Sequence, residues 1–465
     1  MIGFEMFELD FDIDLIKKYD QPGPRYTSYP TAPHFHEGFT ADNYLDEIVR
    51  TNTAVVKPPL SLYYHLPFCD TLCYFCGCNM IITRNRDRIK DYIKYVKNEI
   101  DLLRTYLDVD RPVTQLHWGG GTPTHLIPDE IYDLVSYINT SFKIDPAIEA
   151  GCEIDPRGLE RAHLEALRSG GFNRISMGVQ DFTPAVQKAV NRVQPESMTR
   201  QVVSWVRELG FSSINLDLIY GLPFQTKEDF LKTVRAVIDI SPDRIAVFNY
   251  AHVPWMKKHM GLIKQEDLPK PEVKLEILQQ TIEELVKAGY VFIGMDHFAK
   301  PTDEMAVALR DKKLYRNFQG YSTNAGADLY AFGITSISQI GRVYAQNLKK
   351  EKEYFDSLND EKLPVHKGIY LTDDDLLRRE VIMKVMCDFE LEFNNFEKEF
   401  NINFKEYFAN SLENLKAMEE DGLLSISETG LQVSNKGRLL IRNIAMKFDG
   451  FIERKEDQGR YSRTV

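Results

Sequence analysis

Four of the six cysteines in this chain fall within ten residues, in the order Cys69-x-x-x-Cys73-x-x-Cys76-x-Cys78. Thiols this close together in sequence are typical of metal ligands, because a deprotonated cysteine binds iron or zinc strongly. The first three can surround one small iron–sulfur cluster from a single loop. A cubane cluster normally takes four cysteines. Three ligands therefore leave one iron open, where it can hold a substrate and pass it an electron.

Two other interpretations of these thiols, a zinc site and disulfides, have less support from the sequence. A structural zinc site usually has two cysteine pairs separated by a longer spacer, whereas here both pairs would share one loop. Disulfides need an oxidising compartment, and the first residues, MIGFEMFELDFDID, lack the basic start and apolar core of a secretion signal. We therefore expect reduced thiols in a cytoplasmic protein. Cys152 and Cys387 are isolated in sequence and are expected to be buried as small apolar side chains.

The bulk composition is that of a large globular protein. With 465 residues, the chain exceeds the size at which one hydrophobic core stops growing, so we expect a large domain and a smaller one. No apolar run approaches the length that spans a bilayer, and we expect no membrane association. The net charge of −12 argues against nucleic-acid binding. A polyanionic substrate would have to bind at a local basic patch.

Short β-rich runs alternate with amphipathic helical runs through the middle of the chain. This alternation predicts parallel strands joined by right-handed helical crossovers. Six such units would make a barrel or a large part of one. The expected strands are residues 60–65, 113–118, 149–154, 174–179, 213–219 and 244–248, and the expected helices are residues 86–106, 129–141, 161–169, 184–191, 197–209 and 227–239.

Glycine and polar residues follow these strands rather than precede them. Examples are Gly119-Gly-Gly-Thr-Pro123, Glu153-Ile-Asp-Pro156 and Asp217-Leu-Ile-Tyr-Gly-Leu-Pro223. In barrel enzymes the active site lies at the C-terminal ends of the strands. One such loop is ordinary turn chemistry, but five of them, beside a cysteine cluster that also follows a strand, favour a functional site.

The two ends of the chain differ from its middle. Prolines bracket the motif GPRYTSYP, which ends at Pro30, and exclude a helix there. Near the other end, helices flank a hairpin at 423–434 in an arrangement that resembles a winged helix. Since the acidic charge disfavours DNA binding, we expect a lid or packing domain. The expected regions are an N-terminal arm (1–55), a barrel (56–300), an extension and connector (301–369) and a mainly helical C-terminal domain (370–465).

Motifs spread over nearly the whole chain carry a family resemblance. The three-cysteine spacing with Phe75 before the third cysteine, and Gly119-Gly-Gly-Thr-Pro123, fit the radical S-adenosylmethionine (radical SAM) superfamily. Motifs from Gly23-Pro-Arg-Tyr-Thr-Ser-Tyr-Pro-Thr31 to Arg438-Leu-Leu-Ile-Arg-Asn443 resemble, more closely, the oxygen-independent coproporphyrinogen III oxidase family. The resemblance implies an α/β fold, a partial (β/α)6 TIM-like barrel of the radical SAM type.

The same resemblance implies the cofactors: one 4Fe-4S cluster, bound by Cys69, Cys73 and Cys76, and two S-adenosylmethionine molecules. The residue types suit these ligands, because a carboxylate such as Glu153 can bond a ribose or an ammonium group. An arginine such as Arg192 can pair with a methionine carboxylate in a bidentate way. By match to the family's motifs, the cluster-bound molecule would be contacted by Tyr63, Gly120, Glu153 and Ile337, and the second by Phe75, Gly121, Thr122, Gln180, Arg192, Asp217 and Ala251.

The implied reaction converts two propionates of coproporphyrinogen III to vinyl groups in haem biosynthesis, without oxygen. An external low-potential donor, such as a flavodoxin-like protein, supplies the electron that cleaves S-adenosylmethionine. The resulting 5′-deoxyadenosyl radical takes a hydrogen from the propionate β-carbon, and carbon dioxide and one electron are then lost. Because the substrate is a tetracarboxylate, we expect Arg25, Tyr26 and Tyr29 of the arm to close over it, with Arg342 and Lys300 as weaker candidates. The alternative for Arg25 is a salt bridge that holds the arm.

Other functions and roles stay open at this point. A haem-binding or haem-delivery relative would share the barrel and the cysteines, but such relatives typically lack the arm motif and the fourth cysteine that this chain has. A zinc-stabilised winged-helix protein is the third hypothesis. Cys78 could donate hydrogen, lie near the substrate or be structural, and His65 could flank the cluster or belong to the core. No catalytic residue is assigned, and a monomer is expected.

Overall fold

The computed structural model describes residues 11–452, 461, 463 and 464. The chain divides into two compact units. We call residues 35–278 and 326–370 the barrel unit, and the described residues of 1–34, 279–325 and 371–465 the terminal unit. Residues 1–10 of the expected arm, and residues 453–460, 462 and 465 of the expected C-terminal domain, lie outside the described part.

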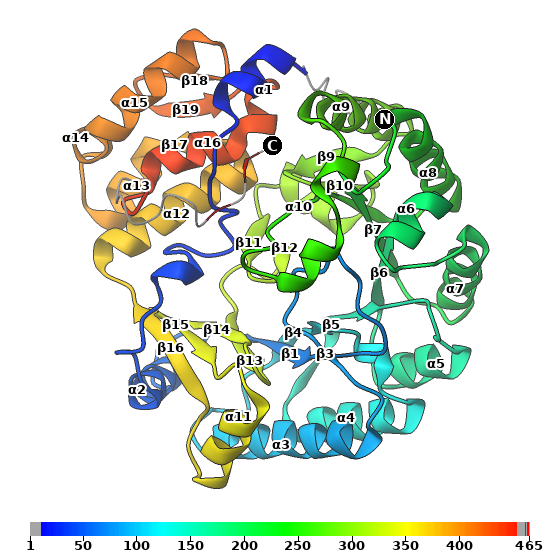
Figure 1. The fold of residues 1–465 in the computed structure, drawn as a ribbon. Coiled ribbons are helices and arrows are strands. Elements are labelled where there is room, and N and C mark those ends of the chain that lie inside the picture. Colours follow the sequence, from blue (N-terminus) through cyan, green and yellow to red (C-terminus); the bar gives the residue numbers. More distant parts are fainter. Residues whose placement is uncertain (1–10, 453–460, 462, 465) are drawn as a thin grey trace. The chain divides into compact units, whose positions relative to one another are not determined.

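Six parallel strands form the centre of the barrel unit, and each pairs with the next one along the chain (Figure 1). Helices lie outside these strands, as the alternating pattern predicts. The partial (β/α)6 barrel is therefore confirmed. The strands are β1 (Leu60–Leu66), β4 (Val113–Gly120), β5 (Ile144–Ile154), β6 (Arg174–Gln180), β7 (Ser213–Tyr220) and β8 (Arg244–Asn249).

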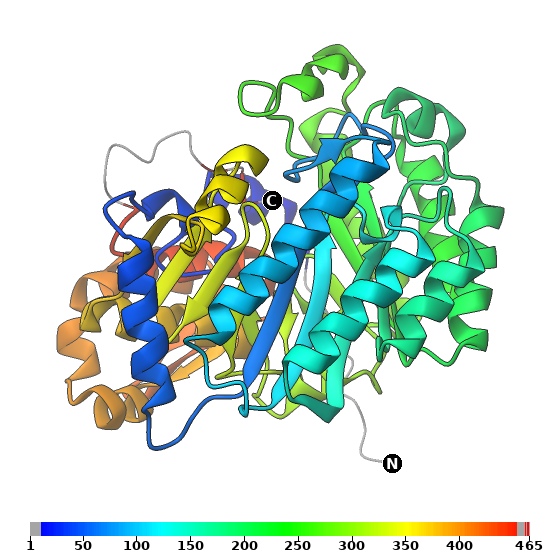
Figure 2. The same cartoon turned by 90° about the horizontal axis from the view of Figure 1, so that it is seen from below.

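The crossover helices bury one apolar face each and begin at local signals in the sequence. Asn85 caps the first of them by accepting hydrogen bonds from the backbone N–H groups of Asp87 and Arg88. Figure 2 shows α3 and α4 side by side over the outer face of the strands. The helices are α3 (Arg86–Arg104), α4 (Pro128–Ser141), α5 (Arg161–Ser169), α6 (Pro184–Ala189), α7 (Glu196–Glu208) and α8 (Lys227–Ile240), and α9 (Pro271–Lys287) follows.

Four further strands extend the sheet beyond β1, which the sequence analysis did not predict. The first, β13 (Asp328–Phe332), runs parallel to β1, with Asp328 opposite Leu60. Because every residue of β13 is buried, it shows no alternating pattern, and its partner is far away in sequence. The strands β14 (Ile337–Ile340), β15 (Val343–Asn347) and β16 (Val365–Tyr370) follow as antiparallel neighbours, and α11 (Glu351–Asn359) connects the last two.

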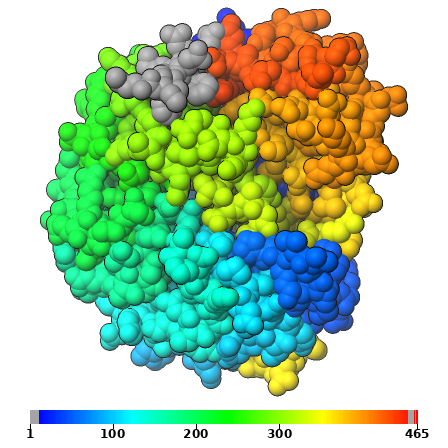
Figure 3. Space-filling model, turned by 180° about the vertical axis from the view of Figure 1, so that it is seen from behind, coloured from blue at the N-terminus to red at the C-terminus, as the bar shows by residue number. Residues whose placement is uncertain are grey.

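Part of the expected N-terminal arm belongs to the barrel unit. Residues Ala41–Asn52 form α2, which starts at a capping box between Thr40 and Asn43. The side-chain amide of Asn52 donates to the carbonyl of Tyr106 at 2.6 Å, and on the face shown in Figure 3 the blue segment that contains α2 lies beside the cyan segment. This part of the arm is therefore fixed against the barrel helices.

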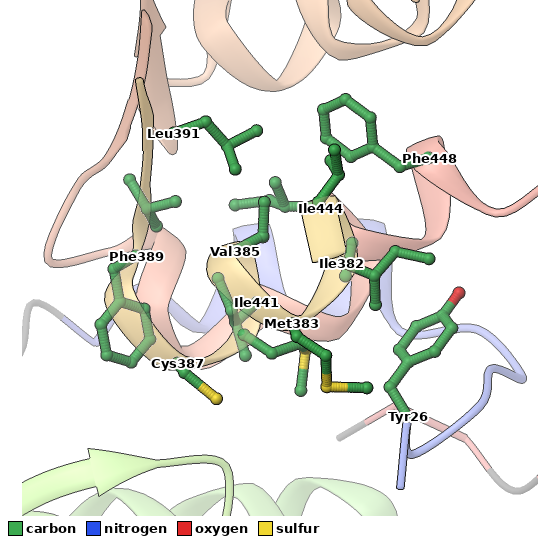
Figure 4. Close-up of a cluster of buried hydrophobic side chains, with 14 of the residues drawn as sticks. Tyr26, Ile382, Met383, Val385, Cys387, Phe389, Leu391, Ile441, Ile444 and Phe448 are labelled. Carbon is green, nitrogen blue, oxygen red and sulfur yellow. The ribbon is translucent and has the colours of Figure 1, made fainter. Parts of the chain in front are cut away.

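The terminal unit has its own hydrophobic core, formed mainly by α12 (Asp373–Asp388) and α16 (Ile441–Ala445) (Figure 4). Tyr26 of the arm packs in the same cluster. The expected hairpin is present as β18 (Leu424–Ile426) and β19 (Gly430–Val433), and β17 (Glu390–Glu392) adds a third strand. The remaining elements are α1 (Ile13–Tyr19), β9 (Val291–Gly294), β10 (His297–Ala299), α10 (Glu304–Arg310), β11 (Tyr315–Asn317), β12 (Gly320–Ser322), α13 (Phe393–Phe400), α14 (Phe404–Tyr407) and α15 (Ala409–Glu420).

None of the helices in the described part of the chain is both long enough and apolar enough to cross a lipid bilayer.

Candidate active site

The clustered cysteines lie on one loop that follows β1 in the barrel unit. A short parallel pair, β2 (Phe68–Cys69) and β3 (Ile81–Ile82), closes the base of this loop. The backbone N–H of Ile81 donates to the carbonyl of Pro67 at 2.7 Å, and that of Thr83 donates to the carbonyl of Cys69 at 3.1 Å. The loop is therefore anchored at both ends before any metal binds.

Residues from other strand ends hold the loop from outside. Asn191, which follows α6, donates its side-chain amide to the carbonyl of Leu72 at 2.8 Å. After β8, the His259 ring donates to the carbonyl of Cys76 at 2.7 Å, and the Lys257 ammonium donates to the carbonyl of Cys78 at 3.0 Å. These contacts use backbone carbonyls and do not involve the cysteine sulfurs.

The first three cysteines line one cavity of about 690 Å³ at the carboxyl ends of the barrel strands. Among the described residues, no three or more His, Cys, Asp or Glu side chains are grouped closely enough to hold a single metal ion. In a cubane cluster each cysteine binds its own iron, so its ligands do not need to meet at one point. Cys69, Cys73 and Cys76 around a shared cavity are a donor set that fits such a cluster.

Two arginines face the Cys73 sulfur. Arg157 donates to it at 3.3 Å and Arg192 at 3.7 Å. Both arginines therefore place positive charge beside an expected cluster ligand. Burial raises the pKa of the Cys69 thiol to about 11, and the hydroxyl of Thr122 lies 3.4 Å from that sulfur.

Cys78 interacts with Cys76 through its own thiol. The hydrogen bond from Cys78 lowers the pKa of Cys76 to about 6, whereas the same bond, together with burial, raises the pKa of Cys78 well above its ordinary value. Cys76 is therefore the more acidic thiol of this pair. The role of Cys78 is still a hypothesis.

Glu153, the second-last residue of β5, lines the cavity. Its oxygens lie 3.4 Å from His117 Nε2 and 3.3 Å from the backbone N–H of Gly120. Burial raises the pKa of the Glu153 carboxyl, but the His117 ring and the Gly120 N–H outweigh burial, and the pKa is below its ordinary value. Tyr63 stacks on the His117 ring with the ring centroids 6.0 Å apart. An ionised carboxylate is therefore available to a hydroxyl or ammonium group.

The backbone at the end of β4 needs glycine at three consecutive positions, Gly119 to Gly121. Gly120 has a φ of 114°, and a Cβ there would lie 2.7 Å from His65 Nδ1. A Cβ on Gly121 would collide with the carbonyl of Pro67. The first motif glycine, Gly119, leaves room for the Glu153 carboxylate in the same way. The motif thus lets the backbone approach the cavity and the cysteine loop closely.

A buried cluster of charges lies behind Cys73. Asp155 accepts from Arg157 at 2.6 Å and from Arg192 at 2.9 Å. Burial alone would raise the pKa of the Asp155 carboxyl, but Arg192 and Arg157 hold it below its ordinary range. Arg192 also donates to Gln194 and to the carbonyl of Gly178. With Cys73, these contacts use four of the five N–H groups of Arg192, so a bidentate pair with a ligand carboxylate would require one of them to break.

Asp217 on β7 forms another part of the cavity wall. Burial raises the pKa of its carboxyl to about 7, partly offset by the amide of Asn215, which donates to Oδ1 at 2.7 Å. Gln180, which ends β6, has a φ of 65°, and its buried side-chain oxygen has no hydrogen-bond partner among the described residues. A buried oxygen without a partner costs free energy unless a ligand donates to it. Gln180 therefore fits a cofactor contact.

The structure brings together most, but not all, of the residues that the sequence singled out. Tyr63 and Gly120 adjoin the cavity through His117 and Glu153, whereas Ala251 and Ile337 are not among the described residues that line it. The predicted residues that do line it are Cys69, Cys73, Cys76, Phe75, Gly121, Thr122, Glu153, Gln180, Arg192 and Asp217.

The positions of His65 and Arg342 indicate structural roles. The ring of His65 is buried, donates to the carbonyl of Asn79 at 2.9 Å and lies 3.2 Å from the Tyr63 hydroxyl, so it fixes the cysteine loop. Arg342 follows β14, beside Gly341, whose N–H donates to Asp328 at the beginning of β13. Since β13 is parallel to β1, Arg342 lies at the end of the strands opposite the cysteines.

The expected substrate residues of the arm belong to the terminal unit. Arg25 forms a salt bridge with Asp296. Tyr26 donates to Asp449 at 2.8 Å, and the Tyr29 hydroxyl accepts from the backbone N–H of Gly450 at 3.0 Å. Both tyrosine side chains are 1% exposed, so they stabilise the unit and present no free hydroxyl at its surface. Lys300 follows β10 in the same unit.

The sequence analysis assigned no role to several polar residues of the site. His117, Asp155 and Arg157 each orient another group, and none belongs to a motif contact that the resemblance supplied. The signal was present, since Asp155 and Arg157 directly follow Glu153 at the end of a strand. Their contacts with Cys73 and Arg192 depend on the approach of distant loops, which a local pattern does not reveal.

Comparison with protein families identifies two matching regions. Residues 63–237 match the Radical SAM superfamily, and residues 371–440 match the HemN C-terminal domain. The first region contains the cysteine loop and the strand ends up to β7. The second begins just before α12, so the matches fall on both units.

Curated relatives match almost the full chain. Proteins named oxygen-independent coproporphyrinogen III oxidase from Salmonella typhimurium and Escherichia coli are each 47% identical, over 98% of this chain and 99% of their own length. A solved structure of coproporphyrinogen III oxidase from Escherichia coli, described as a radical SAM enzyme, matches with a TM-score of 0.90 and 46% identity, covering 96% of this chain and 100% of that chain.

Proposed function

This chain belongs to the oxygen-independent coproporphyrinogen III oxidases of the radical SAM superfamily, and from that membership we propose that it converts two propionates of coproporphyrinogen III to vinyl groups. The product is protoporphyrinogen IX, in haem biosynthesis without oxygen. The observation that supports this most is the cavity at the barrel mouth, where three thiols meet polar side chains from several strand ends.

The chain's residues have separate tasks in this reaction. Cys69, Cys73 and Cys76 would hold a 4Fe-4S cluster, and Arg157 places a guanidinium group beside the Cys73 sulfur. When bound, the cluster and S-adenosylmethionine supply a carbon-centred radical that takes a hydrogen atom from a propionate. Glu153, ionised at neutral pH, is placed to accept from a ribose hydroxyl or an ammonium group.

We propose two S-adenosylmethionine molecules, as the family resemblance implies. Support for the second comes from the cavity wall at β6 and β7. The carboxyl of Asp217 lies there, as does the Gln180 oxygen, which has no hydrogen-bond partner among the described residues. Arg192 would contribute its one remaining N–H group rather than a bidentate pair. Ala251 and Ile337 remain proposed contacts without support from the cavity lining.

The experiment is an anaerobic incubation of reconstituted protein with dithionite, S-adenosylmethionine and coproporphyrinogen III. We expect 5′-deoxyadenosine and a porphyrinogen with two vinyl groups. Omission of S-adenosylmethionine is the control and should abolish both products. A protein with an intact cluster that forms neither product would overturn the proposal.

A haem-binding or haem-delivery function is the alternative. The arm motif from Pro24 to Pro30 and the fourth cysteine, Cys78, are both present, which favours the oxidase. Tight, stoichiometric haem binding without vinyl formation would favour the alternative. We also propose that the protein is a cytoplasmic monomer, that it does not bind nucleic acid or membranes, and that it needs an external low-potential electron donor.

A further inference from the structure

A second cavity, of about 520 Å³, lies on the other side of the cysteine loop. Cys78 and Met80 line both this outer cavity and the inner cavity that contains the three thiols. The loop is therefore a wall only a few residues thick between the expected cluster and the outer cavity. All residues that line the outer cavity belong to the barrel unit.

The outer cavity is basic, in a chain whose net charge is −12. Its lining contains five lysines and arginines but one carboxylate, Glu351, which pairs with Arg88. Lys350 and Lys352 are 77% and 86% exposed, and their bonds to Glu353 and Asp356 are surface pairs, which contribute little and leave the ammonium groups solvated. We call Arg88, Lys257, Lys349, Lys350 and Lys352 the basic surface.

The basic surface is connected directly to the cysteine loop. Lys257 donates to the carbonyl of Cys78, and two residues later in the chain His259 donates to the carbonyl of Cys76. The residues just before Lys257 are apolar, and Trp255 and Met256 are 72% and 64% exposed. Aromatic and Met side chains are enriched at protein–protein contact sites.

We propose that the basic surface docks an acidic one-electron donor protein, which reduces the cluster through the loop Cys78–Met80. This inference rests on the proposed function, because only a cluster-dependent enzyme needs such a donor. In the step itself the donor is oxidised by one electron and the cluster is reduced by one electron. No bond between heavy atoms forms or breaks at the surface.

A protein donor fits this surface better than the tetracarboxylate substrate. Hydrogen abstraction needs the propionate carbon beside the cofactor, inside the cavity that the thiols line. An electron can instead pass through a thin wall, so its donor can stay outside. The net negative charge of the rest of the chain would repel an acidic protein elsewhere and steer it to the basic surface.

The test compares two charge-reversal variants with equal change in net charge. K350E/K352E alters the basic surface. K143E/K232E is the control, because Lys143 precedes β5 at the opposite end of the strands and Lys232 lies on α8. Binding of purified oxidised flavodoxin, an acidic probe, is measured by calorimetry on anaerobic cluster-loaded protein at two salt concentrations. We expect about tenfold weaker binding for K350E/K352E and no change for the control.

Kinetic measurements distinguish donor docking from a substrate site on the same surface and from a failure of the proposed function. Reduction of the cluster by reduced flavodoxin should slow only in K350E/K352E, while dithionite should reduce all three proteins equally. Equal flavodoxin affinity in both variants, or no binding to the unaltered protein, would overturn the docking proposal. A raised KM for coproporphyrinogen with dithionite in K350E/K352E would overturn it in favour of a substrate site. Absence of vinyl product from the unaltered protein with dithionite would instead reject the proposed function.

Discussion

Arg192 and Asp155 form a buried ion pair, with 2.9 Å between the Arg192 NH1 group and Asp155 Oδ2. The same arginine donates to the Cys73 sulfur, and Asp155 also binds Arg157. One carboxylate therefore orients two cations that face an expected cluster ligand. Because both arginines come from loops after different strands, this arrangement exists only in the folded barrel.

Replacement of Asp155 by Asn should destabilise the protein by about 3 kcal/mol, because it leaves two partly buried guanidinium groups without a counter-charge. Urea unfolding of the cluster-free protein measures this loss. The matched control is Asp239→Asn, which removes the exposed pair with Arg200 and should cost less than about 1 kcal/mol. Equal losses in the two variants would show that the Asp155 cluster does not stabilise the fold.

Substitution of Cys69, Cys73 or Cys76 by alanine should in each case abolish cluster assembly, because we propose that each of them supplies one of the three cluster ligands. Iron and sulfide analysis of anaerobically reconstituted protein, with the visible absorbance, measures the loss. The control is Cys152→Ala, whose thiol is buried in β5 away from the cavity lining. Full iron content in any of the three variants would remove that cysteine from the ligand set.

Binding of S-adenosylmethionine should strengthen as pH rises through 7. Burial raises the pKa of Asp217 to about 7, so at pH 6 only about one carboxyl in ten is ionised. If the ligand binds the ionised form, its dissociation constant is about tenfold higher at pH 6 than well above pH 7. Anaerobic calorimetry from pH 6 to pH 8 measures this change. Asp217→Asn should flatten the pH dependence, and an unchanged profile would exclude Asp217 as its source.

Glu99 on α3 should make folding pH-dependent. It is buried and accepts from Tyr354 at 2.6 Å, from Asn347 at 2.6 Å and from the N–H of Gly333 at 2.8 Å. Burial outweighs these bonds and raises its pKa from 4.5 to about 7. The folded state thus keeps a proton that the unfolded state loses, and the free energy of unfolding falls by about 3 kcal/mol as pH rises through this window.

The measurement is the difference in unfolding free energy between the unaltered protein and Glu99→Gln at pH 4.5 and at pH 8. Glutamine keeps an acceptor oxygen but cannot ionise, so the variant should gain stability relative to the unaltered protein at pH 8. Glu165→Gln, at an exposed position of α5, is the control and should show no such difference. A constant difference at both pH values for Glu99→Gln would contradict the prediction.

Arg25→Ala should spare the cleavage of S-adenosylmethionine but impair decarboxylation, because we propose that Arg25 binds a substrate carboxylate. Separate assays of 5′-deoxyadenosine and of vinyl product measure the two steps. The salt bridge with Asp296 supports a structural role instead, and Asp296→Asn separates the two. This variant keeps the guanidinium, so equal losses of vinyl product in both variants would assign Arg25 to holding the arm.

Local sequence patterns were sufficient to predict the six barrel strands and the cysteine loop. The strands carry apolar runs that end at Gly, Pro and polar residues, and these signals lie within a few residues of each element. The same holds for α5, whose bounds, Arg161–Ser169, agree with the expectation from periodicity. The three thiols also share a cavity, as their spacing predicted.

Contacts between residues far apart in the sequence could not be predicted from such local patterns. The pairing of β13 with β1 joins Asp328 to Leu60, and the fully buried β13 has no alternation by which to recognise it. Tyr26 and Tyr29 were expected to meet the substrate as part of an arm motif, yet their hydroxyls bond to Asp449 and Gly450 near the other end of the chain.

The sequence by itself therefore determined which chemistry this protein can do, because thiols, carboxylates and glycines at short spacings are a local property. Only the tertiary structure decided which cations face Cys73, how many N–H groups Arg192 has left, and which lysines gather outside the cysteine loop. These three arrangements depend on distances between segments that are far apart in the chain. Such distances are fixed only when the side chains pack in the folded protein.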